Sequence, residues 1–495
     1  MEISVLVYLT SGLFLGWALG ANHLGNVFGT AVGTRMIRFT TAATLCSVFV
    51  VLGAVISGGG AAETVGKLGA VNTLSGSFMA AFAAAVAVYI MTRFGLPVST
   101  THAIVGAIIG WSFYSESRTD FNSLTKIMIG WVLGPVLAAI FAVVLLYATG
   151  RALHYMKLHL LRQDAYNRVG LILAGSFGAY SLGANNIANV VGVFIPAAPF
   201  TEFQFLDLIT ISPAQQLFLL GGLAIVAGIF TYSGRVVHTV GKGLFTLSPV
   251  AAWVVVMAHS IVLFLFASEG LESFLAAHGL PTIPLVPISS SEVVVGAVIG
   301  VALVKGAHNF RFGTLGRIGI GWMLTPAIAC LVCYVGLFFM QNVFNQRVYQ
   351  PVHYVVSAEG AAKAESTGVP QAVLKDLIGR KFGSAYAFKD ALMVRDGLTR
   401  DQIDMLLGLS ELEPIAVRPE ALGLGRPEWL SPSQMAAVEA LGGRIFQYRW
   451  MLMQALAERN AKWRLREDIV ANKKHNQGIR YRIELLYRAH EDGRK

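Results

Sequence analysis

Long apolar segments separated by short polar ones fill the first two thirds of the chain. Each segment is long enough to cross or half-cross a bilayer, and together they predict a polytopic, all-α membrane protein. The segments form two groups of five, near residues 4–21, 40–57, 77–94, 97–113 and 126–149, and near residues 169–195, 214–233, 247–268, 288–304 and 317–341.

Four motifs recur in the two groups in the same order. They are GANHLGNVFG at 20–29 with GANNIANVVG at 183–192, ETVGK at 63–67 with HTVGK at 238–242, PVSTTH at 97–102 with PISSSE at 287–292, and IGWVLGP at 129–135 with IGWMLTP at 320–326. This order predicts two copies of one unit, repeat A over residues 1–150 and repeat B over residues 165–343. Five segments per copy is an odd number, so we expect the copies to be inverted, with broken or re-entrant helices, as in secondary transporters.

The pattern changes after residue 345. Residues 1–345 hold 25 of the 66 charged residues, although they make up more than two thirds of the chain. We therefore predict a hydrophilic, helical C-terminal domain over residues 346–495. Ser431-Pro-Ser-Gln434 is a capping-box start, and apolar residues follow it at helical spacing: Met435, Val438, Leu441, Ile445, Tyr448, Leu452 and Leu456. Thr399-Arg-Asp-Gln402 opens a second helix in the same way, and docking or dimerisation is the simplest role for this domain.

Composition agrees with a membrane protein and excludes other classes. Only 13% of residues are charged and the mean hydropathy is +0.61, outside the range of soluble globular proteins. The net charge of +10 lies largely in loops and in the C-terminal domain, which indicates membrane orientation and not nucleic-acid binding. Cys330 and Cys333 lie in an apolar segment and are interpreted as helix-packing residues, without a metal site. No catalytic set is visible, so we do not predict an enzyme. We predict a multi-pass protein of a bacterial-type plasma membrane.

Two triplets of hydroxyl residues stand at the predicted starts of short apolar helices. Ser99, Thr100 and Thr101 follow Pro97, and the matching Ser289, Ser290 and Ser291 follow Pro287. A helix N-terminus offers unpaired N–H groups and the positive end of the helix dipole, and hydroxyls add neutral donors. This combination predicts an anion site that needs no buried arginine. Ordinary N-capping is the alternative, although a single cap needs only one hydroxyl.

Two matched pairs of asparagines form the second candidate element. Asn22 and Asn26 are four residues apart, as are Asn185 and Asn189, so each pair shares one helix face. Carboxamides supply both donors and acceptors, and we expect the adjacent Gly20 and Gly183 to allow a helix break there. Intramembrane asparagines can instead hold helices together, but two matched pairs favour a functional site.

The GAN-x-x-x-N, P-x-S-T-T-H and T-V-G-K elements resemble the inorganic phosphate transporter (PiT) family of cation-coupled phosphate and sulfate carriers. The resemblance covers nearly all of residues 1–343 and none of the C-terminal domain. It implies an inverted-repeat bundle with an anion site between the asparagine and hydroxyl motifs. Carried over by position, the substrate-binding residues are Asn22, His23, Asn26, Ser99, Thr100, Thr101, Asn185, Asn186, Asn189, Ser289, Ser290 and Ser291.

The chain departs from the family pattern at three positions. The family motif has Asp after its first Asn, where this chain has His23 and Asn186, and Glu292 stands where the family usually has His. Sodium prefers anionic oxygen ligands, so losing both carboxylates argues against sodium coupling. His23, His102 and Glu292 are then the titratable candidates for proton coupling. A site without carboxylates also favours sulfate over phosphate, because sulfate carries no proton that a carboxylate could accept in a hydrogen bond.

The sequence thus predicts a cation-coupled symporter of a small tetrahedral oxyanion, with phosphate favoured by family resemblance and H⁺ or Na⁺ as the coupling ion. A proton-coupled sulfate permease is the first alternative. The second is a non-transporting anion sensor that signals through the C-terminal domain to a cytosolic partner, and uptake after deletion beyond residue 345 separates the two classes. The predicted partners are the lipid bilayer and the anion. The sequence does not decide whether the chain forms a homo-oligomer or what the C-terminal domain binds.

Overall fold

The computed structural model describes residues 3–69, 71–93, 98–157, 159–197, 200, 203–205, 209–240, 247–306, 312–394, 398–422, 429–467 and 469–492. The chain separates into two compact units. The first contains residues 1–115, 119–272 and 282–350, and the second contains residues 351–495 with the short segments 116–118 and 273–281.

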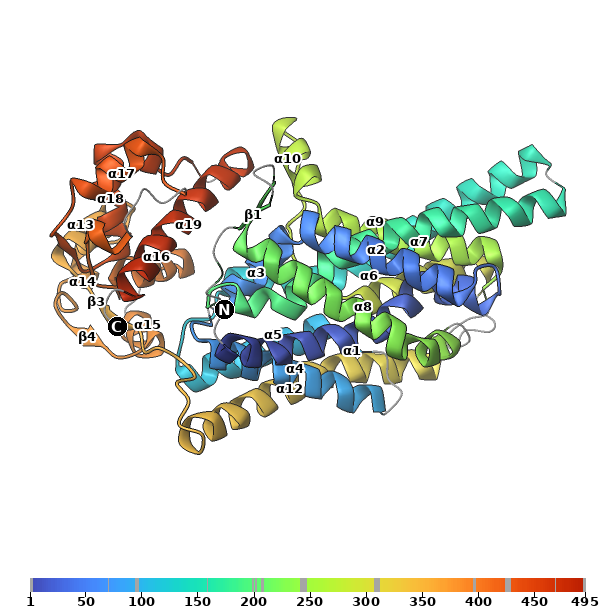
Figure 1. Ribbon diagram of the computed structural model, residues 1–495, viewed down its shortest axis with the longest axis horizontal. Coiled ribbons are helices and arrows are strands. Elements are labelled where there is room, and N and C mark those ends of the chain that lie inside the picture. Colours follow the sequence, from blue (N-terminus) through green and yellow to red (C-terminus); the bar gives the residue numbers. More distant parts are fainter. Residues whose placement is uncertain are drawn as a thin grey trace. The chain divides into compact units, whose positions relative to one another are not determined.

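Helices make up almost all of residues 1–350 (Figure 1). They are α1 (Ile3–Gly33), α2 (Phe39–Ser57), α3 (Gly59–Gly69), α4 (Leu74–Arg93), α5 (Thr100–Ser115), α6 (Phe121–Met156), α7 (Leu160–Val191), η1 (Gly192–Phe194), α8 (Pro213–Val240), α9 (Pro249–Ala267), α10 (Glu269–Ala277), α11 (Ser290–Lys305) and α12 (Phe312–Asn342), with a β1 (Phe203–Phe205) and β2 (Ile209–Ile211) hairpin before α8. Within the described residues, seven helices are long and apolar enough to cross a membrane: α1, α2, α4, α6, α8, α9 and α12. At 16 residues each, α5 and α11 are too short for a full crossing.

The two asparagine motifs lie inside continuous helices, so the expected helix breaks at Gly20 and Gly183 are wrong. Gly20 lies within α1 and Gly183 within α7. A Cβ atom at Gly20 would overlap the carbonyl oxygen of Ile225 in α8, and one at Gly183 would overlap that of Val50 in α2. These glycines therefore permit close approach of neighbouring helix backbones and do not interrupt their own helices.

Helices of the two predicted copies pack against each other in matched pairs. α1 packs against α8, and α7, the counterpart of α1, packs against α2. In the same way α5 packs against α12 and α11 against α6. Pairs exchanged in this manner are what a pseudo-two-fold relation between two copies would produce.

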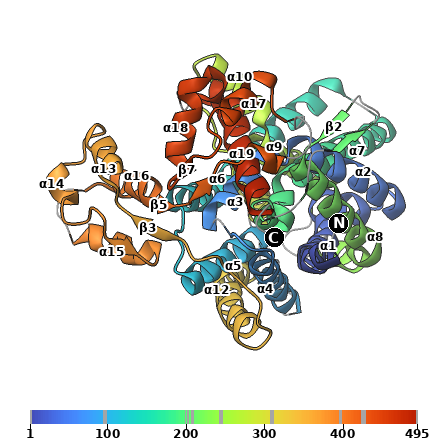
Figure 2. The same ribbon diagram turned by 60° about the vertical axis from the view of Figure 1, so that its left-hand side comes forward.

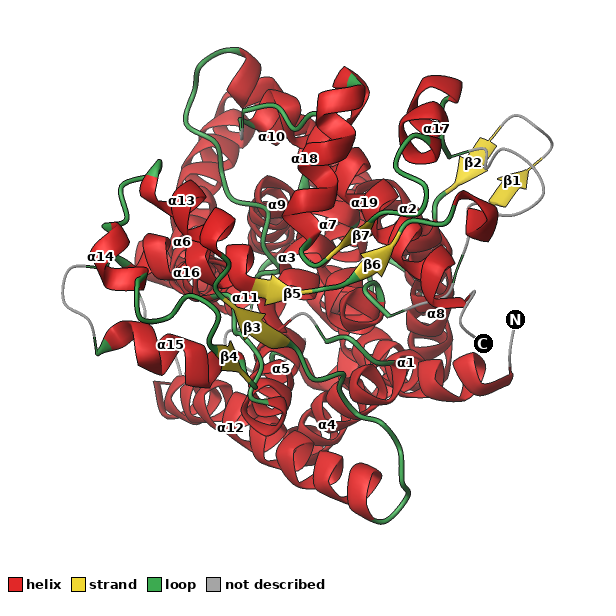
Figure 3. Cartoon of the chain, turned by 90° about the vertical axis from the view of Figure 1, so that its left-hand side faces the viewer, coloured by secondary structure: helices red, strands yellow, loops and turns green. Residues whose placement is uncertain are grey.

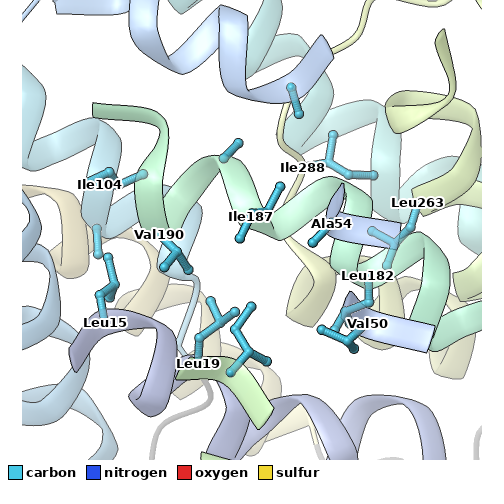
Figure 4. Close-up of a cluster of buried hydrophobic side chains, with 14 of the residues drawn as sticks. Leu15, Leu19, Val50, Ala54, Ile104, Leu182, Ile187, Val190, Leu263 and Ile288 are labelled. Carbon is cyan, nitrogen blue, oxygen red and sulfur yellow. The ribbon is translucent and has the colours of Figure 1, made fainter. Parts of the chain in front are cut away.

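Buried apolar side chains cluster around the middle of α7 (Figure 4). Leu182, Ile187 and Val190 of α7 are buried, and they belong to the same core cluster as Leu19 of α1 and Ile288, which precedes α11. The cluster draws its members from both copies. The polar residues of the α7 motif are consequently enclosed by hydrocarbon, where each unpaired polar group costs free energy.

The C-terminal unit is mainly helical, as predicted, with short strands of two or three residues between its helices (Figure 3). Its elements are β3 (His353–Val355), α13 (Ala358–Glu365), α14 (Gln371–Leu374), β4 (Lys381–Phe382), α15 (Ala385–Met393), α16 (Arg400–Ser410), β5 (Glu411–Leu412), β6 (Ile415–Ala416), η2 (Pro419–Leu422), α17 (Pro432–Glu439), β7 (Ile445–Phe446), α18 (Arg449–Arg459), η3 (Ala461–Trp463) and α19 (Val470–Asp492). Strand order is β4-β3-β5 in one sheet and β6-β7 in the other, all antiparallel.

The capping boxes at Thr399 and Ser431 open α16 and α17 as predicted. The apolar series after Ser431 is not one helix, however. α17 ends at Glu439, Gly443 adopts a φ of 78°, and β7 intervenes before α18 begins at Arg449. A glycine with positive φ provides the turn that a continuing helix would not allow.

The helices of the C-terminal unit form two groups, α13–α16 and α17–α19 (Figure 2). The sequence AVLKDLIGRKF at 372–382 matches AAVEALGGRIF at 436–446, a shift of 64 residues. Gly379 and Gly443 both have positive φ, and their N–H groups donate to Val356 and Val417 at 2.9 and 2.8 Å. Each module has its own apolar core. The unit therefore consists of two small modules that share this motif, each with helices and short strands.

Stability of this unit should fall as pH rises through neutrality. Burial, followed by the nearby charge of Glu413, raises the pKa of Glu411 from 4.5 to about 7. Between these values the folded state retains a proton that the unfolded chain releases. The free energy of unfolding should therefore decrease with rising pH, by on the order of 1 kcal/mol.

Hydrogen exchange of peptides from residues 353–412 in the full chain, corrected for intrinsic rates at pH 5 to 8, measures this effect. Glu411→Gln should flatten the pH dependence, whereas the exposed control Glu439→Gln should keep it. Equal slopes in the wild type and in Glu411→Gln would remove Glu411 as the cause.

Candidate functional site

The starts of α5 and α11 carry the two hydroxyl triplets. Ser99 accepts a hydrogen bond from the N–H of His102 at 3.2 Å, and Ser289 accepts one from the N–H of Glu292 at 3.4 Å. The first hydroxyl of each triplet is thus an N-cap, as the alternative interpretation of the sequence proposed. The remaining two hydroxyls in each triplet are not needed for the helix start. Pro97 lies outside the described residues.

The second asparagine of each copy contacts the hydroxyl motif of the other copy. Asn26 Nδ2 in α1 donates to Ser290 Oγ at the start of α11, at 3.0 Å. Asn189 Nδ2 in α7 donates to Thr100 Oγ1 at the start of α5, at 3.4 Å. Asn26 and Asn189 occupy matching motif positions, and so do Thr100 and Ser290. The two contacts are therefore reciprocal, and each joins one copy to the other.

The start of α5 also meets the chain just before α11. Thr101 Oγ1 donates to the carbonyl of Ile288 at 3.4 Å and accepts from Asn189 Nδ2 at 3.0 Å. Asn185 pairs with both backbone groups of Ile288: its Nδ2 donates to the carbonyl at 2.8 Å, and its Oδ1 accepts from the N–H at 3.0 Å. This two-point contact fixes the peptide that leads into the second hydroxyl triplet, so α7 positions both helix starts.

Asn186 connects this cluster to α1. Its Oδ1 accepts hydrogen bonds from Asn185 and Asn189 at 3.0 and 3.2 Å, and its Nδ2 lies 3.1 Å from Nε2 of His23. All four side chains are at most 3% exposed. A continuous polar network therefore runs from His23 through the α7 asparagines to Thr101, inside an apolar surround.

His102 and Glu292, which occupy matching motif positions, contact each other. His102 Nε2 lies 3.1 Å from Glu292 Oε1, and both side chains are 5% exposed. The ring of Trp131 packs edge-on against His102 with 3.8 Å between the ring centres. The replacement of His by Glu in the second motif thus creates a buried acid–base pair between the two copies, directly beside the helix starts.

Several sequence-predicted residues have partners outside the network. Asn22 donates to the carbonyl of Ala18 in its own helix at 3.2 Å, and Ser291 bonds to Ser289 at 3.1 Å. In the first T-V-G-K element, Thr64 donates to the carbonyl of Leu285 at 2.7 Å and ties α3 to the loop before α11. The second T-V-G-K element runs into residues that are not described.

Two contributors were not predicted from the sequence. The backbone of Ile288 could not have been found from residue type, because any residue carries the same groups. Trp131 lies in the repeated I-G-W motif, a signal that sequence analysis noted without assigning a role.

This arrangement is suited to a small anion held by neutral donors. Residues 18–30, 98–115, 172–192 and 288–304, which form the site, contain no lysine or arginine. Hydroxyls, carboxamides and two helix N-termini provide the donors. Across the part of the chain that the structure covers, no three His, Cys, Asp or Glu side chains gather as a metal site.

Comparison with known proteins gives a consistent set of relatives. The sequence model described as "Phosphate transporter family" matches residues 19–333. A "Putative phosphate permease" of Thermococcus kodakarensis is 26% identical over 410 residues, covering 67% of this chain and 96% of the relative. Relatives with the same description from Methanocaldococcus jannaschii and Haemophilus influenzae are 24% and 22% identical, covering 68% and 69% of this chain and 97% and 98% of the relatives.

A solved structure has a similar fold. It is titled "The sodium-dependent phosphate transporter" and matches with a TM-score of 0.56 at 22% identity, covering 69% of this chain and 99% of that chain. The family match ends before the C-terminal unit begins, so the two modules of that unit are an addition to the part that the relatives share.

Proposed function

Because this chain belongs to the phosphate transporter family, we propose that it is a secondary transporter that carries inorganic phosphate across the bilayer by alternating access. The chain is an integral, multi-pass membrane protein. Relatives that match about two thirds of this chain over nearly their whole length are described as permeases. In our proposal the anion binds between α1, α7 and the starts of α5 and α11.

One observation carries the proposal: the reciprocal contacts of Asn26 with Ser290 and of Asn189 with Thr100. In each contact the hydroxyl oxygen accepts, so its own proton remains available to donate to an anion. The two hydroxyls belong to different copies and stand at two helix N-termini. An anion bound by both would link the copies, and a shift of one copy relative to the other would open the site to either side.

Phosphate is favoured over sulfate by an unused acceptor in the cluster. Asn189 Oδ1 is buried and has no hydrogen-bond partner among the described residues. Phosphate near neutral pH carries a proton that can donate to this oxygen, whereas sulfate carries none and leaves it unsatisfied. Sites that hydrogen-bond a ligand hydroxyl reject analogues lacking it strongly, because the buried partner is then left unpaired. The unpaired Asn189 oxygen therefore favours phosphate more strongly than the missing carboxylates favour sulfate.

We propose the proton as the coupling ion. His23 and Asn186 replace the two carboxylates of the family motif, which leaves amide and hydroxyl oxygens as weak ligands for sodium. His23, His102 and Glu292 are buried titratable groups within or beside the network. Buried ionisable residues in a membrane protein are the usual carriers of coupled protons.

Uptake of labelled phosphate and sulfate into liposomes containing the purified full chain tests this function. With the membrane potential clamped, we expect phosphate uptake driven by an inward proton gradient and unaffected by a sodium gradient. Sulfate should compete at least about 100-fold less well than phosphate. Sodium-driven uptake would contradict proton coupling, and preferred sulfate uptake would contradict the role of Asn189. No uptake under any gradient would favour the non-transporting sensor.

A further inference from the structure

The contact between His102 and Glu292 places an imidazole and a carboxyl group together at the boundary between the two copies. His102 lies in the first turn of α5 and Glu292 in the first turn of α11. His102 Nε2 is 3.1 Å from Glu292 Oε1, and both side chains are 5% exposed. The second carboxyl oxygen, Oε2, is buried and has no hydrogen-bond partner among the described residues. A charged carboxylate held in this way is costly, so the pair requires an explanation beyond packing.

The pair shares its two helix N-termini with the proposed anion site. The N–H groups of His102 and Glu292 are the ones that Ser99 and Ser289 cap, and Thr101 donates to the carbonyl of Ile288 just before α11. A carboxylate in the first turn of a helix interacts favourably with the positive end of the helix dipole. An anion at the helix start uses the same positive end. A charged Glu292 and a bound phosphate therefore compete for α11 and repel each other.

One proton on the pair removes this competition. With one proton the pair has no net charge, whether the proton lies on the imidazole beside a carboxylate or on the carboxyl group beside a neutral imidazole. Without the proton the pair carries one negative charge. Phosphate should consequently bind more tightly to the protein whose pair holds a proton.

Neighbouring helices provide no other charge that could take over this role. α5 packs against α3, α4, α7 and α12, and α11 packs against α1, α6 and α9. The charged residues described on these helices are exposed, except Glu63, which pairs with Lys67. Of the other buried titratable groups, His23 contacts Asn186 and Tyr180 bonds to Ser57. The titratable residues on α5, α11 and these seven helices are Tyr8, His23, Glu63, Lys67, Tyr89, Arg93, His102, Tyr114, Lys126, Tyr147, Arg151, His154, Tyr155, Arg162, Asp164, Tyr166, Arg168, Tyr180, His259, Glu292, Lys305, Arg317, Cys330, Cys333 and Tyr334.

The repeat gives a second reason to treat the two residues as one unit. They occupy matching positions of the P-x-S-T-T-H and P-I-S-S-S-E elements, and the structure brings these positions into contact. Histidine at both positions, the usual family pattern, would place two like groups there. Glu292 makes the pair an acid with a base, whose net charge changes from zero to minus one when a single proton leaves.

We infer that His102 and Glu292 together form the proton site of this transporter, gaining one proton when a phosphate dianion binds and losing it when phosphate leaves; this inference rests on the proposed function. The proton comes from the side to which the site is open and is released on the other side with the anion. Only an N–H or O–H bond of the pair forms and breaks. Because the two binding events are linked, proton and phosphate strengthen each other's binding by the same factor.

Binding of labelled phosphate to the purified full chain between pH 6 and pH 8 tests this site, with the dissociation constant expressed for the dianion. In the wild type this constant should rise by about tenfold per pH unit where the pair loses its proton. In Glu292→Gln it should not change with pH, because the amide carries no charge that a proton must neutralise. Asp164→Asn removes an exposed carboxylate that pairs with Arg168, and this control should behave as the wild type.

Exchanging the two residues provides a rescue experiment. His102→Glu/Glu292→His returns an acid and a base to the same contact in opposite order, so the pH dependence that Glu292→Gln loses should reappear. Proton uptake gives a second measurement, made by adding phosphate at pH 8 to each protein in weak buffer. We expect about one proton taken up per phosphate bound in the wild type and in the exchanged protein, and none in Glu292→Gln.

A Glu292→Gln protein with the wild-type pH dependence and proton uptake would overturn the inference. So would a folded Glu292→Gln protein that binds no phosphate at any pH, because Glu292 would then belong to the anion site or to the fold. An exchanged protein that melts as the wild type but shows no pH dependence would overturn it as well. Absence of phosphate binding in the wild type would instead overturn the proposed function.

Discussion

Replacing Thr100 and Ser290 together with valine is expected to reduce phosphate uptake to background while the protein remains folded. Each hydroxyl accepts from an asparagine of the other copy and keeps its proton for the anion. A hydrogen bond to a charged group contributes about 1.5–3 kcal/mol, so losing two should weaken phosphate binding by at least about 100-fold. Binding of labelled phosphate to the purified protein and uptake into proteoliposomes measure the loss.

Thr325→Val is the matched control for this pair. Thr325 is fully buried in α12, and its hydroxyl donates to the carbonyl of Gly321 of the same helix. The substitution removes one buried hydroxyl with the same change of shape, so uptake should stay near the wild-type rate. If Thr100→Val/Ser290→Val transports as well as Thr325→Val, the anion does not bind at the two helix starts.

Gly20→Ala is expected to prevent the membrane unit from folding. A methyl group at this position would overlap the carbonyl oxygen of Ile225, which belongs to the backbone of α8 and cannot rotate away. Separating α1 from α8 would disturb the packing of both, at a cost of about 3 kcal/mol or more. The measurements are the fraction of protein recovered as a monodisperse species in detergent and its melting temperature.

Gly29→Ala, in the same helix, provides the contrast. A methyl group there meets no atom within 4 Å, and alanine favours a helix over glycine by about 1 kcal/mol. Gly29→Ala should therefore be recovered at least as well as the wild type. A Gly20→Ala protein that melts at the wild-type temperature would show that α1 and α8 are not in close backbone contact.

Local sequence features predicted much of this architecture. Apolar segment lengths gave the membrane class, and the four repeated motifs gave the duplication, because both depend on residues that are near one another in the chain. The capping boxes at Thr399 and Ser431 were readable for the same reason. In the C-terminal unit the apolar spacing after Ser431 suggested one helix, because periodicity alone does not show that α17 ends at Glu439 and that the chain turns at Gly443.

The site itself was predictable as a set of residues, but their pairing was not. The sequence could not distinguish Asn22, which bonds to its own helix, from Asn26, which reaches Ser290. It named His102 and Glu292 separately, without indicating that they meet. Such contacts join residues on different helices, and no local pattern encodes which helix lies next to which.

By itself, then, the amino-acid sequence determined the membrane class, the two copies and the residue types at the helix starts and asparagine faces. Tertiary structure alone decided that each copy contacts the hydroxyls of the other and that Ile288 is fixed through its backbone. The physical reason is the separation along the chain of the residues that interact. Helix starts and apolar faces are set by neighbours within a few residues, whereas Asn26 and Ser290 are 264 residues apart and meet only because four helices pack together.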